Sequence, residues 1–189
     1  MKIAVIVGSS REASESERVA KYMSEKLSCE TDIISLKNNP LNLWSDQIYT
    51  DKAFLDLQKR MKQADAYLII VPEWNGMVPP TLKNFLFSMT VNEVGHKPAM
   101  ICAISAGMNG AYPVAELKAF SSKNNYMVYI PDTLILKSVS GLFTGENKEP
   151  QDLLTRIEDS LSSLEDYAVA LAGYREKRGD KSIKYGQGH

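Results

Sequence analysis

Hydroxyl side chains and one arginine gather in the segment from Gly8 to Ser16, which lies between a short apolar run and a stretch of helical spacing. Backbone N–H groups at a helix N-terminus, together with the partial positive charge there, favour an anion. Ser9, Ser14 and Ser16 add hydroxyl donors. Arg11 adds a permanent positive charge. The segment predicts a phosphate site, although Ser14 as a plain helix N-cap and Arg11 as a solvated side chain explain it about equally well.

The better-known phosphate loops do not fit this segment. It lacks the ending of GxxxxGK[ST], so an NTPase would have neither its phosphate lysine nor its magnesium ligand. It also lacks the spaced glycines of GxGxxG, which let a dinucleotide pyrophosphate come close to the backbone. A hydroxyl-rich loop instead suits a terminal monophosphate, such as the one that FMN carries.

A second segment of interest follows a later apolar run. Trp74 offers a flat aromatic face, and Asn75 has donor and acceptor groups for the edge of a heterocycle. Two consecutive prolines, Pro79 and Pro80, restrict the backbone and start the next helix near a fixed position. Taken alone, this segment is better explained by Trp74 packing on the core and by an Asn75-Gly76 turn.

The third segment runs from Ser105 to Pro113, after the next apolar run. Gly107 and Gly110 allow a ligand to come close to the backbone, and the proline marks the start of a helix. An ordinary glycine-containing turn explains these residues equally well.

Short, continuous apolar runs alternate five times with segments of helical spacing. Such runs are typical of strands buried on both faces, and the intervening helices favour a parallel sheet with right-handed crossovers. We therefore predict a doubly wound α/β fold, with a five-stranded parallel sheet in the order 2-1-3-4-5 and helices on both faces. The predicted strands cover residues 3–7, 32–35, 66–71, 99–104 and 127–130.

In this strand order the three polar segments meet. They follow strands 1, 3 and 4, which are neighbours, and the direction of winding reverses between strands 1 and 3. Ligands of such sheets bind outside the carboxyl ends of the strands at this reversal. The three segments are therefore predicted to line one crevice.

Composition excludes several classes of protein. The chain has 189 residues and a net charge of −1, which fits one domain and gives no field to hold nucleic acid or an anionic membrane. Cys29 and Cys102 lack the spacing of a zinc site or a disulfide framework. The N-terminal apolar run is too short for a signal segment, and no run approaches the roughly 20 apolar residues of a membrane span. A cytoplasmic location is expected, with no metal centre.

One domain is predicted over residues 1–174. Its last helix carries an apolar stripe that ends at Leu171, which we assign to packing on the sheet, with a dimer seam as the alternative. Residues 175–189 are polar and rich in Lys, Arg and Gly, so a flexible C-terminal tail is expected.

The three segments, in this order and at these distances, resemble the motifs of the NADPH-dependent FMN reductase family, a flavodoxin-like group that includes quinone, azo-dye and chromate reductases. The resemblance covers roughly Met1 to Gly173. GSSRxxSxS, from Gly8, resembles the family's GSxRxxSxN. PEWNGMVPPTLKN, from Pro72, resembles PEYNGSxPGxLKN and is the most specific of the three. SAGxxG, from Ser105, resembles the third flavin loop.

Five positions depart from the family pattern. Ser16 stands where Asn is usual, and it keeps a donor with a shorter reach. Trp74 replaces Tyr and keeps a flat face, whereas Met77 replaces Ser and removes a hydroxyl near the flavin or the substrate. Pro80 stands where Gly is usual, and Ala111 where a second Gly often lies. These changes bear on the choice of substrate more than on flavin binding.

The resemblance implies a bound FMN, with NAD(P)H as co-substrate, and a role for each motif residue. The FMN phosphate would be held by Ser9, Arg11, Ser14 and Ser16, and the isoalloxazine would be lined by Pro72, Glu73, Trp74, Asn75 and Gly76 and, on its other side, by Ser105 and Gly107.

No catalytic side-chain acid or base is expected, because the flavin itself carries the chemistry. The resemblance implies hydride transfer from NAD(P)H through FMN to a quinone, azo compound, free flavin or metal oxyanion, in a ping-pong cycle. Backbone N–H groups near Asn75 and Gly76 would stabilise negative charge at the reactive ring edge. Of the two histidines, His96 precedes the fourth strand and His189 lies in the tail, so a His-dependent hydrolase is not expected.

Two other interpretations remain. A flavodoxin-like electron carrier or redox sensor would bind FMN without using nicotinamide, although a net charge of −1 gives little steering toward cationic partners. A flavin-free interaction domain would be colourless.

The family resemblance also implies a homodimer, or a tetramer of dimers, in which a neighbouring subunit completes the flavin pocket. The predicted helix over residues 82–94 and the long last helix are the candidates for the contact.

Overall fold

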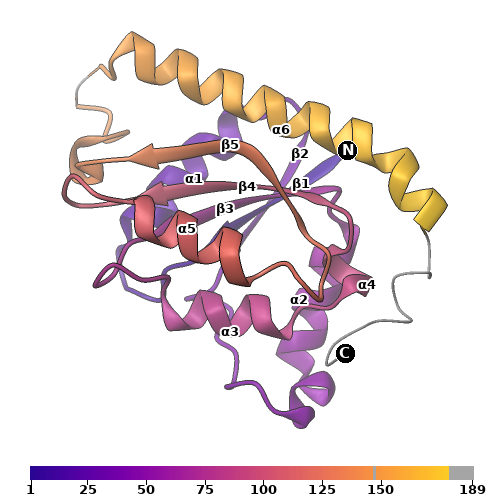
Figure 1. Cartoon of the computed structure of the whole chain (residues 1–189). Coiled ribbons are helices and arrows are strands. Elements are labelled where there is room, and N and C mark those ends of the chain that lie inside the picture. The colour runs from indigo at the N-terminus through magenta and orange to yellow at the C-terminus, as the bar shows by residue number, and fades with distance from the viewer. Residues whose placement is uncertain (147, 179–189) are drawn as a thin grey trace.

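A five-stranded parallel sheet runs through the middle of the molecule (Figure 1). The computed structural model describes residues 1–146 and 148–178. The strand order is β2-β1-β3-β4-β5, and every neighbouring pair is parallel, which confirms the predicted topology. The strands are β1 (Lys2–Val7), β2 (Glu30–Ser35), β3 (Ala66–Pro72), β4 (Pro98–Ile104) and β5 (Val128–Leu136).

The central strands face apolar cores on both sides. Every residue of β3 and β4 is buried. Along β1, Ile3 and Val5 contribute to one core, whereas Ala4 and Ile6 contribute to the other. Burial on both faces requires apolar side chains at successive positions, and this requirement explains the continuous runs in the sequence.

Helices cover both faces of the sheet, as predicted (Figure 1). On one face lie α1 (Glu15–Lys26) and α6 (Gln151–Arg178), and α6 runs along the top of Figure 1. Two short 3₁₀ helices, η1 (Asp46–Thr50) and η2 (Val139–Gly141), occur in loops. No helix in the described part of the chain is long and apolar enough to cross a membrane. The other face is covered by α2 (Lys52–Gln63), α3 (Pro80–Ser88), α4 (Val91–Val94) and α5 (Ala111–Phe120).

The prediction of one helix over residues 82–94 is wrong, because the chain forms two helices there. α3 ends at Ser88, and α4 begins at Val91. Between them, Thr90 and Glu93 form a capping box, in which the Glu93 carboxylate accepts from the Thr90 backbone N–H at 2.9 Å. A capping box satisfies N–H groups that a new helix start leaves free, so it marks the beginning of a second helix at Val91.

Strand β5 is longer than the predicted 127–130, because it runs from Val128 to Leu136. Pro131 ends the apolar run in the sequence, so the second half of the strand is not recognisable from the apolar pattern. β5 lies at the edge of the sheet, and its pairing with β4 shifts in register between Ala99 and Ile101. Edge strands and irregularities are the places where a sheet tolerates proline.

The last helix packs on the sheet, as the apolar stripe predicted. Ile157, Leu161, Leu164 and Ala168 are buried in the core that β1 and α1 also line. α6 continues to Arg178, so residues 175–178 of the expected tail are helical. Residues 179–189 lie outside the described part of the chain.

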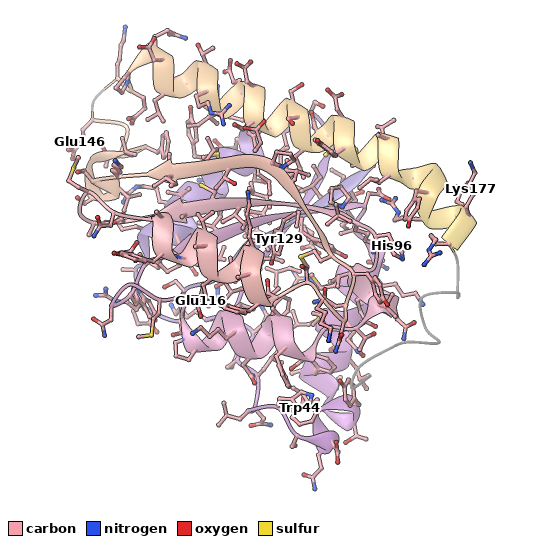
Figure 2. The ribbon with its side chains drawn as sticks, in the orientation of Figure 1. Trp44, His96, Glu116, Tyr129, Glu146 and Lys177 are labelled. Carbon is pink, nitrogen blue, oxygen red and sulfur yellow. The ribbon has the colours of Figure 1, made fainter. Side chains whose placement is uncertain are left out.

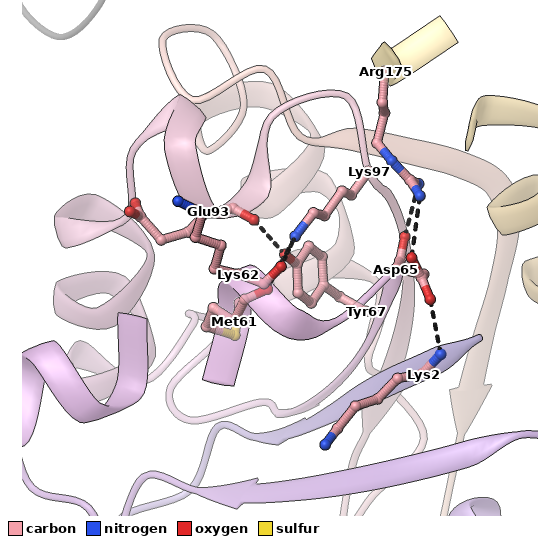
Figure 3. Close-up of polar contacts among 8 residues, drawn as sticks. All are labelled: Lys2, Met61, Lys62, Asp65, Tyr67, Glu93, Lys97 and Arg175. Atoms are coloured by element: carbon pink, nitrogen blue, oxygen red, sulfur yellow. Dashed lines mark hydrogen bonds and ion pairs between the residues drawn. The ribbon is translucent and has the colours of Figure 1, made fainter. Parts of the chain in front are cut away.

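The far end of α6 is tied to the start of β3 (Figure 3). The Arg175 guanidinium donates to the backbone carbonyl of Asp65 at 3.1 Å and to its carboxylate at 3.2 Å. The same carboxylate accepts from the backbone N–H of Lys2 at 2.9 Å. Asp65 therefore joins α6, β1 and β3 at the amino-terminal edge of the sheet.

Lys97 lies beside this junction and holds the C-terminus of α2 (Figure 3). Its ammonium donates to the carbonyl oxygens of Met61 and Lys62, at 3.1 Å and 2.9 Å. These are among the last carbonyls of the helix, which lack partners within it. Burial, together with the nearby positive charge of Arg175, lowers the pKa of Lys97 to about 8.

Lys97 makes the stability of the fold depend on pH. Its pKa is about 8 in the folded chain and 10.5 ordinarily, so between these values the unfolded chain binds more protons. The free energy of unfolding therefore rises with pH in this window. We expect the wild type to gain about 2 kcal/mol between pH 7.5 and 9.5, relative to Lys97→Met, in urea unfolding followed by circular dichroism.

Lys59→Met is the matched control, because Lys59 is an exposed lysine of the same helix, α2. Its pH dependence should equal that of the wild type. Equal slopes for the wild type and Lys97→Met would show that Lys97 carries its full charge in the fold.

Candidate active site

The three predicted segments lie side by side at the carboxyl edge of the sheet, toward which the arrowheads in Figure 1 point. Each is tied to the neighbouring strand at its first residue. The backbone N–H of Gly8 donates to the Ile70 carbonyl at 2.9 Å, and that of Glu73 donates to Ile104 at 3.0 Å. The N–H of Ser105 donates to the Leu136 carbonyl at 2.9 Å. The sheet thus brings the three loops together as predicted.

The first loop turns sharply against α3. A side chain at Gly8 would place its Cβ 2.7 Å from Cδ2 of Leu82 and 3.0 Å from the Ile70 carbonyl, so any larger residue would force Leu82 to move. Ser9 is buried, and its Oγ accepts from the backbone N–H of Arg11 at 3.2 Å. The Arg11 side chain is exposed at the tip of the loop.

Ser14 is the N-cap of α1, because its Oγ accepts from the backbone N–H of Ser16 at 3.1 Å. The N-cap predicted at Ser14 is thus confirmed. The Ser14 hydroxyl hydrogen is not used in this bond. The Ser16 Oγ is fully buried and has no hydrogen-bond partner among the described residues.

A buried hydroxyl without a partner costs free energy, so Ser16 points to a group that binds there. It lies in the first turn of α1, where the helix dipole also favours an anion. Ser9, Ser14 and Ser16 therefore fit the FMN phosphate predicted at this loop.

The second loop forms a tight two-residue turn. The backbone groups of Trp74 and Met77 exchange two hydrogen bonds, at 3.1 Å and 2.9 Å. Between them, Asn75 has φ of 50° and Gly76 has φ of 71°. Positive φ at both central positions is the geometry for which Asn-Gly is preferred, so the predicted turn is confirmed. Trp74 is only half-buried, which leaves part of its ring accessible.

The third loop is bonded to the segment that follows β5. The Ser105 Oγ accepts from the backbone N–H of Gly107 at 3.2 Å. The carbonyl of Ser105 accepts from Val139 at 3.0 Å, and that of Gly107 accepts from Ser138 at 2.9 Å. A Cβ at Gly107 would meet nothing closer than 4.0 Å, so this backbone is open to a ligand.

Carboxylates link the second and third loops. Glu73 reaches the third loop and accepts from the backbone N–H of Gly110 at 2.6 Å. Glu116 on α5, labelled in Figure 2, accepts from the N–H of Val78 at 2.8 Å and forms an ion pair with Lys83. Burial raises the pKa of Glu116, but its bonds to Lys83 and Val78 outweigh burial, and the pKa lies below its ordinary value.

Sequence reasoning missed Glu116 and also Arg18. The Arg18 side chain donates to the Leu142 carbonyl at 2.8 Å and to the Val139 carbonyl at 2.9 Å. Val139 also donates its backbone N–H to the carbonyl of Ser105. Arg18 therefore connects α1 to a residue that holds the third loop. Both residues resemble ordinary helix-surface charges in the sequence, so no local signal marked them.

The arrangement offers hydroxyl donors and a helix N-terminus at one end and an open aromatic turn at the other. His96 lies at the opposite edge of the sheet, as predicted (Figure 2). A parallel sheet of order 2-1-3-4-5, with such loops at its winding reversal, defines the flavodoxin-like class of α/β protein.

Comparison with known proteins narrows this class. The model of the family described as NADPH-dependent FMN reductase matches residues 1–140. An NADPH azoreductase from Bacillus sp. (strain OY1-2) is 26% identical over 167 residues, which cover 88% of this chain and 92% of that protein. An FMN-dependent NADPH-azoreductase from Staphylococcus haemolyticus is 28% identical over 129 residues, which cover 62% and 68% of the two chains.

A solved structure supports the same fold. The flavoenzyme FerB of Paracoccus denitrificans, an NAD(P)H:(acceptor) oxidoreductase, superposes with a TM-score of 0.76 and 22% identity, over 89% of this chain and 97% of FerB. The chain belongs to the NADPH-dependent FMN reductase family. This membership confirms the predicted family, the oxidoreductase class, and FMN with NAD(P)H as cofactor and co-substrate.

Removing the buried hydroxyl of Ser16 should affect binding and stability in opposite directions. In Ser16→Ala, the affinity of the apoprotein for FMN should fall roughly tenfold to hundredfold, because a bond to a charged phosphate is lost. The free energy of unfolding of the apoprotein should stay the same or rise by about 1 kcal/mol, since an unpartnered polar group is removed. Fluorescence titration with FMN and urea unfolding measure the two quantities.

Ser10→Ala serves as control, because Ser10 is an exposed serine of the same loop. It should leave both quantities unchanged. Unaltered FMN affinity in Ser16→Ala would remove Ser16 from the phosphate site.

Proposed function

We propose that this protein holds FMN in the crevice between the three loops and passes a hydride from NAD(P)H through it to a small acceptor. The observation that carries this proposal is the Ser16 hydroxyl, buried without a partner in the loop whose pattern resembles the family's phosphate motif. When bound, FMN supplies the hydride chemistry, so the chain needs only to position and polarise.

The proposed roles of the residues follow from their places around the crevice. Ser9, Arg11, Ser14 and Ser16 bind the phosphate. The turn from Trp74 to Met77 lies between the first and third loops, where its backbone N–H groups at Asn75 and Gly76 stabilise negative charge on the ring. The remaining contacts to the ring come from Pro72, Glu73, Trp74, Ser105 and Gly107.

One accessible face would serve both substrates in turn. Met77 and Met108, on the second and third loops, are exposed and would flank this face. NAD(P)⁺ must therefore leave before the acceptor binds, which gives ping-pong kinetics. Exposed thioether side chains favour flat aromatic acceptors, such as quinones and azo compounds, over a strongly hydrated metal oxyanion.

An apolar patch on α3 and α5 supports the homodimer. Phe87 on α3 and Phe120 on α5 are 64% and 84% exposed, and they border a hollow of about 770 Å³. Trp44, labelled in Figure 2, packs edge-on against Phe87 with ring centroids 5.2 Å apart. Clustered large apolar side chains mark interaction surfaces, so α3 is favoured over α6 as the contact. A second copy would cover this patch.

A cytoplasmic location fits the two cysteines, Cys29 and Cys102, which are both free. Unpaired thiols persist most readily in a reducing compartment.

Anaerobic mixing with NADPH tests the proposed function. The purified protein should be yellow and should lose its oxidised flavin absorbance rapidly, because the nicotinamide reaches the ring. In steady state with a quinone, double-reciprocal plots at several NADPH concentrations should give parallel lines.

Three results would disagree with this proposal in different ways. A yellow protein that NADPH does not bleach would be an electron carrier or a redox sensor. A colourless protein that ignores added FMN would be a flavin-free domain. Intersecting lines would exclude the ping-pong order alone.

Charged substitutions on the α3–α5 patch should separate the dimer. Phe87→Asp should weaken dimerisation by roughly thirtyfold or more, because exposed aromatic residues dominate such contacts. Analytical ultracentrifugation measures the change. Val169→Asp is the control, since Val169 is 68% exposed on α6. If Val169→Asp separated the dimer and Phe87→Asp did not, α6 would be the contact.

A further inference from the structure

The second and third loops hold each other through two carboxylates. The Glu73 carboxylate, at the start of the second loop, accepts from the backbone N–H of Gly110 in the third loop at 2.6 Å. In the opposite direction, Glu116 follows the third loop and accepts from the N–H of Val78 at 2.8 Å. We call these two hydrogen bonds the carboxylate brace.

The brace encloses the turn that would face the flavin ring. Glu73 immediately precedes the turn and Val78 immediately follows it, so one end of the Trp74–Met77 turn is held to the third loop and the other to α5, the helix that follows this loop. Within the turn, two hydrogen bonds fix its own shape. These internal bonds do not fix the distance between the turn and the third loop. That distance depends on the carboxylate brace and on the ends of β3 and β4.

Gly110 is a firm point of attachment. Its φ is 123°, and an added Cβ would lie 2.5 Å from Cγ2 of Ile135 on β5, so the backbone is pressed against the sheet. Gly110 is also the N-cap of α5, where backbone N–H groups lack partners within the helix. The Glu73 carboxylate is thus bonded to a residue whose backbone is packed tightly against β5.

We propose that Glu73 is a positioning residue, which sets the separation between the two loops that flank the isoalloxazine by accepting the Gly110 hydrogen bond. Its acceptor oxygen and its reach matter for this role, and its negative charge does not. The inference rests on the proposed place of FMN in this crevice. A slot shaped in advance for a flat ring binds it at a lower cost in ordering.

Two conservative variants of Glu73 distinguish the effect of its side-chain length from the effect of its negative charge. Glu73→Gln keeps an acceptor oxygen at the same distance and loses the charge, whereas Glu73→Asp keeps the charge and is one methylene too short. The apoprotein of Glu73→Asp should bind FMN at least tenfold more weakly than the wild type. Glu73→Gln should stay within threefold. Fluorescence titration with FMN measures the affinity.

Amide exchange gives a readout that needs no flavin. In the apoprotein, the Gly110 N–H should exchange at least tenfold faster in Glu73→Asp and within threefold of the wild type in Glu73→Gln, as followed by NMR. Glu25→Asp is the matched control, because it shortens an exposed glutamate on α1 and should change neither readout.

The reverse order, with Gln weakened and Asp like the wild type, would overturn the inference in favour of a role for the charge. Wild-type behaviour of both variants would also overturn it. If Glu73→Asp fails to fold, Glu73→Ala replaces it, because it removes the acceptor oxygen, and wild-type affinity and Gly110 exchange in Glu73→Ala would overturn the inference. A wild-type apoprotein that binds no FMN would refute the proposed function, and Gly110 exchange would still decide the brace.

Discussion

The site depends on one constraint of parallel strands: the chain leaves each of them at the same edge of the sheet. At that edge the first N–H of each of the three loops bonds to the strand beside it, as Gly8 bonds to Ile70 and Glu73 to Ile104. These bonds continue the sheet by one residue beyond each strand. The loops therefore start from fixed positions, and short polar segments far apart in the sequence can cooperate in one crevice.

The sequence was sufficient for features that are encoded locally. Continuous apolar runs predicted the buried strands and, with the crossover rule, their order. Ser14 as a cap and Asn75-Gly76 as a turn were also readable, because each conformation requires those residue types. Sequence reasoning proposed a phosphate site in the first loop, but only the fold shows that the hydroxyl of Ser16 is buried without a partner among the described residues.

Features that depend on distant partners could not be predicted. Glu116 and Arg18 look like solvated helix charges until the fold brings Val78 and Leu142 to them. The second half of β5 was missed because Pro131 interrupts the apolar run at an edge where the sheet tolerates it. The break at Thr90 had a readable capping signature, and helical spacing on both sides of it concealed the new start.

The proline in β5 also limits how copies of this chain can associate. An uncovered edge strand is a template onto which another strand can add, continuing one sheet into the next. Pro131 has no N–H to offer such a strand, and its carbonyl already accepts from the Lys118 ammonium at 3.3 Å. Edge-to-edge extension is interrupted in the middle of β5. This interruption disfavours assembly by strand addition and leaves the helix faces as the surfaces through which copies could associate.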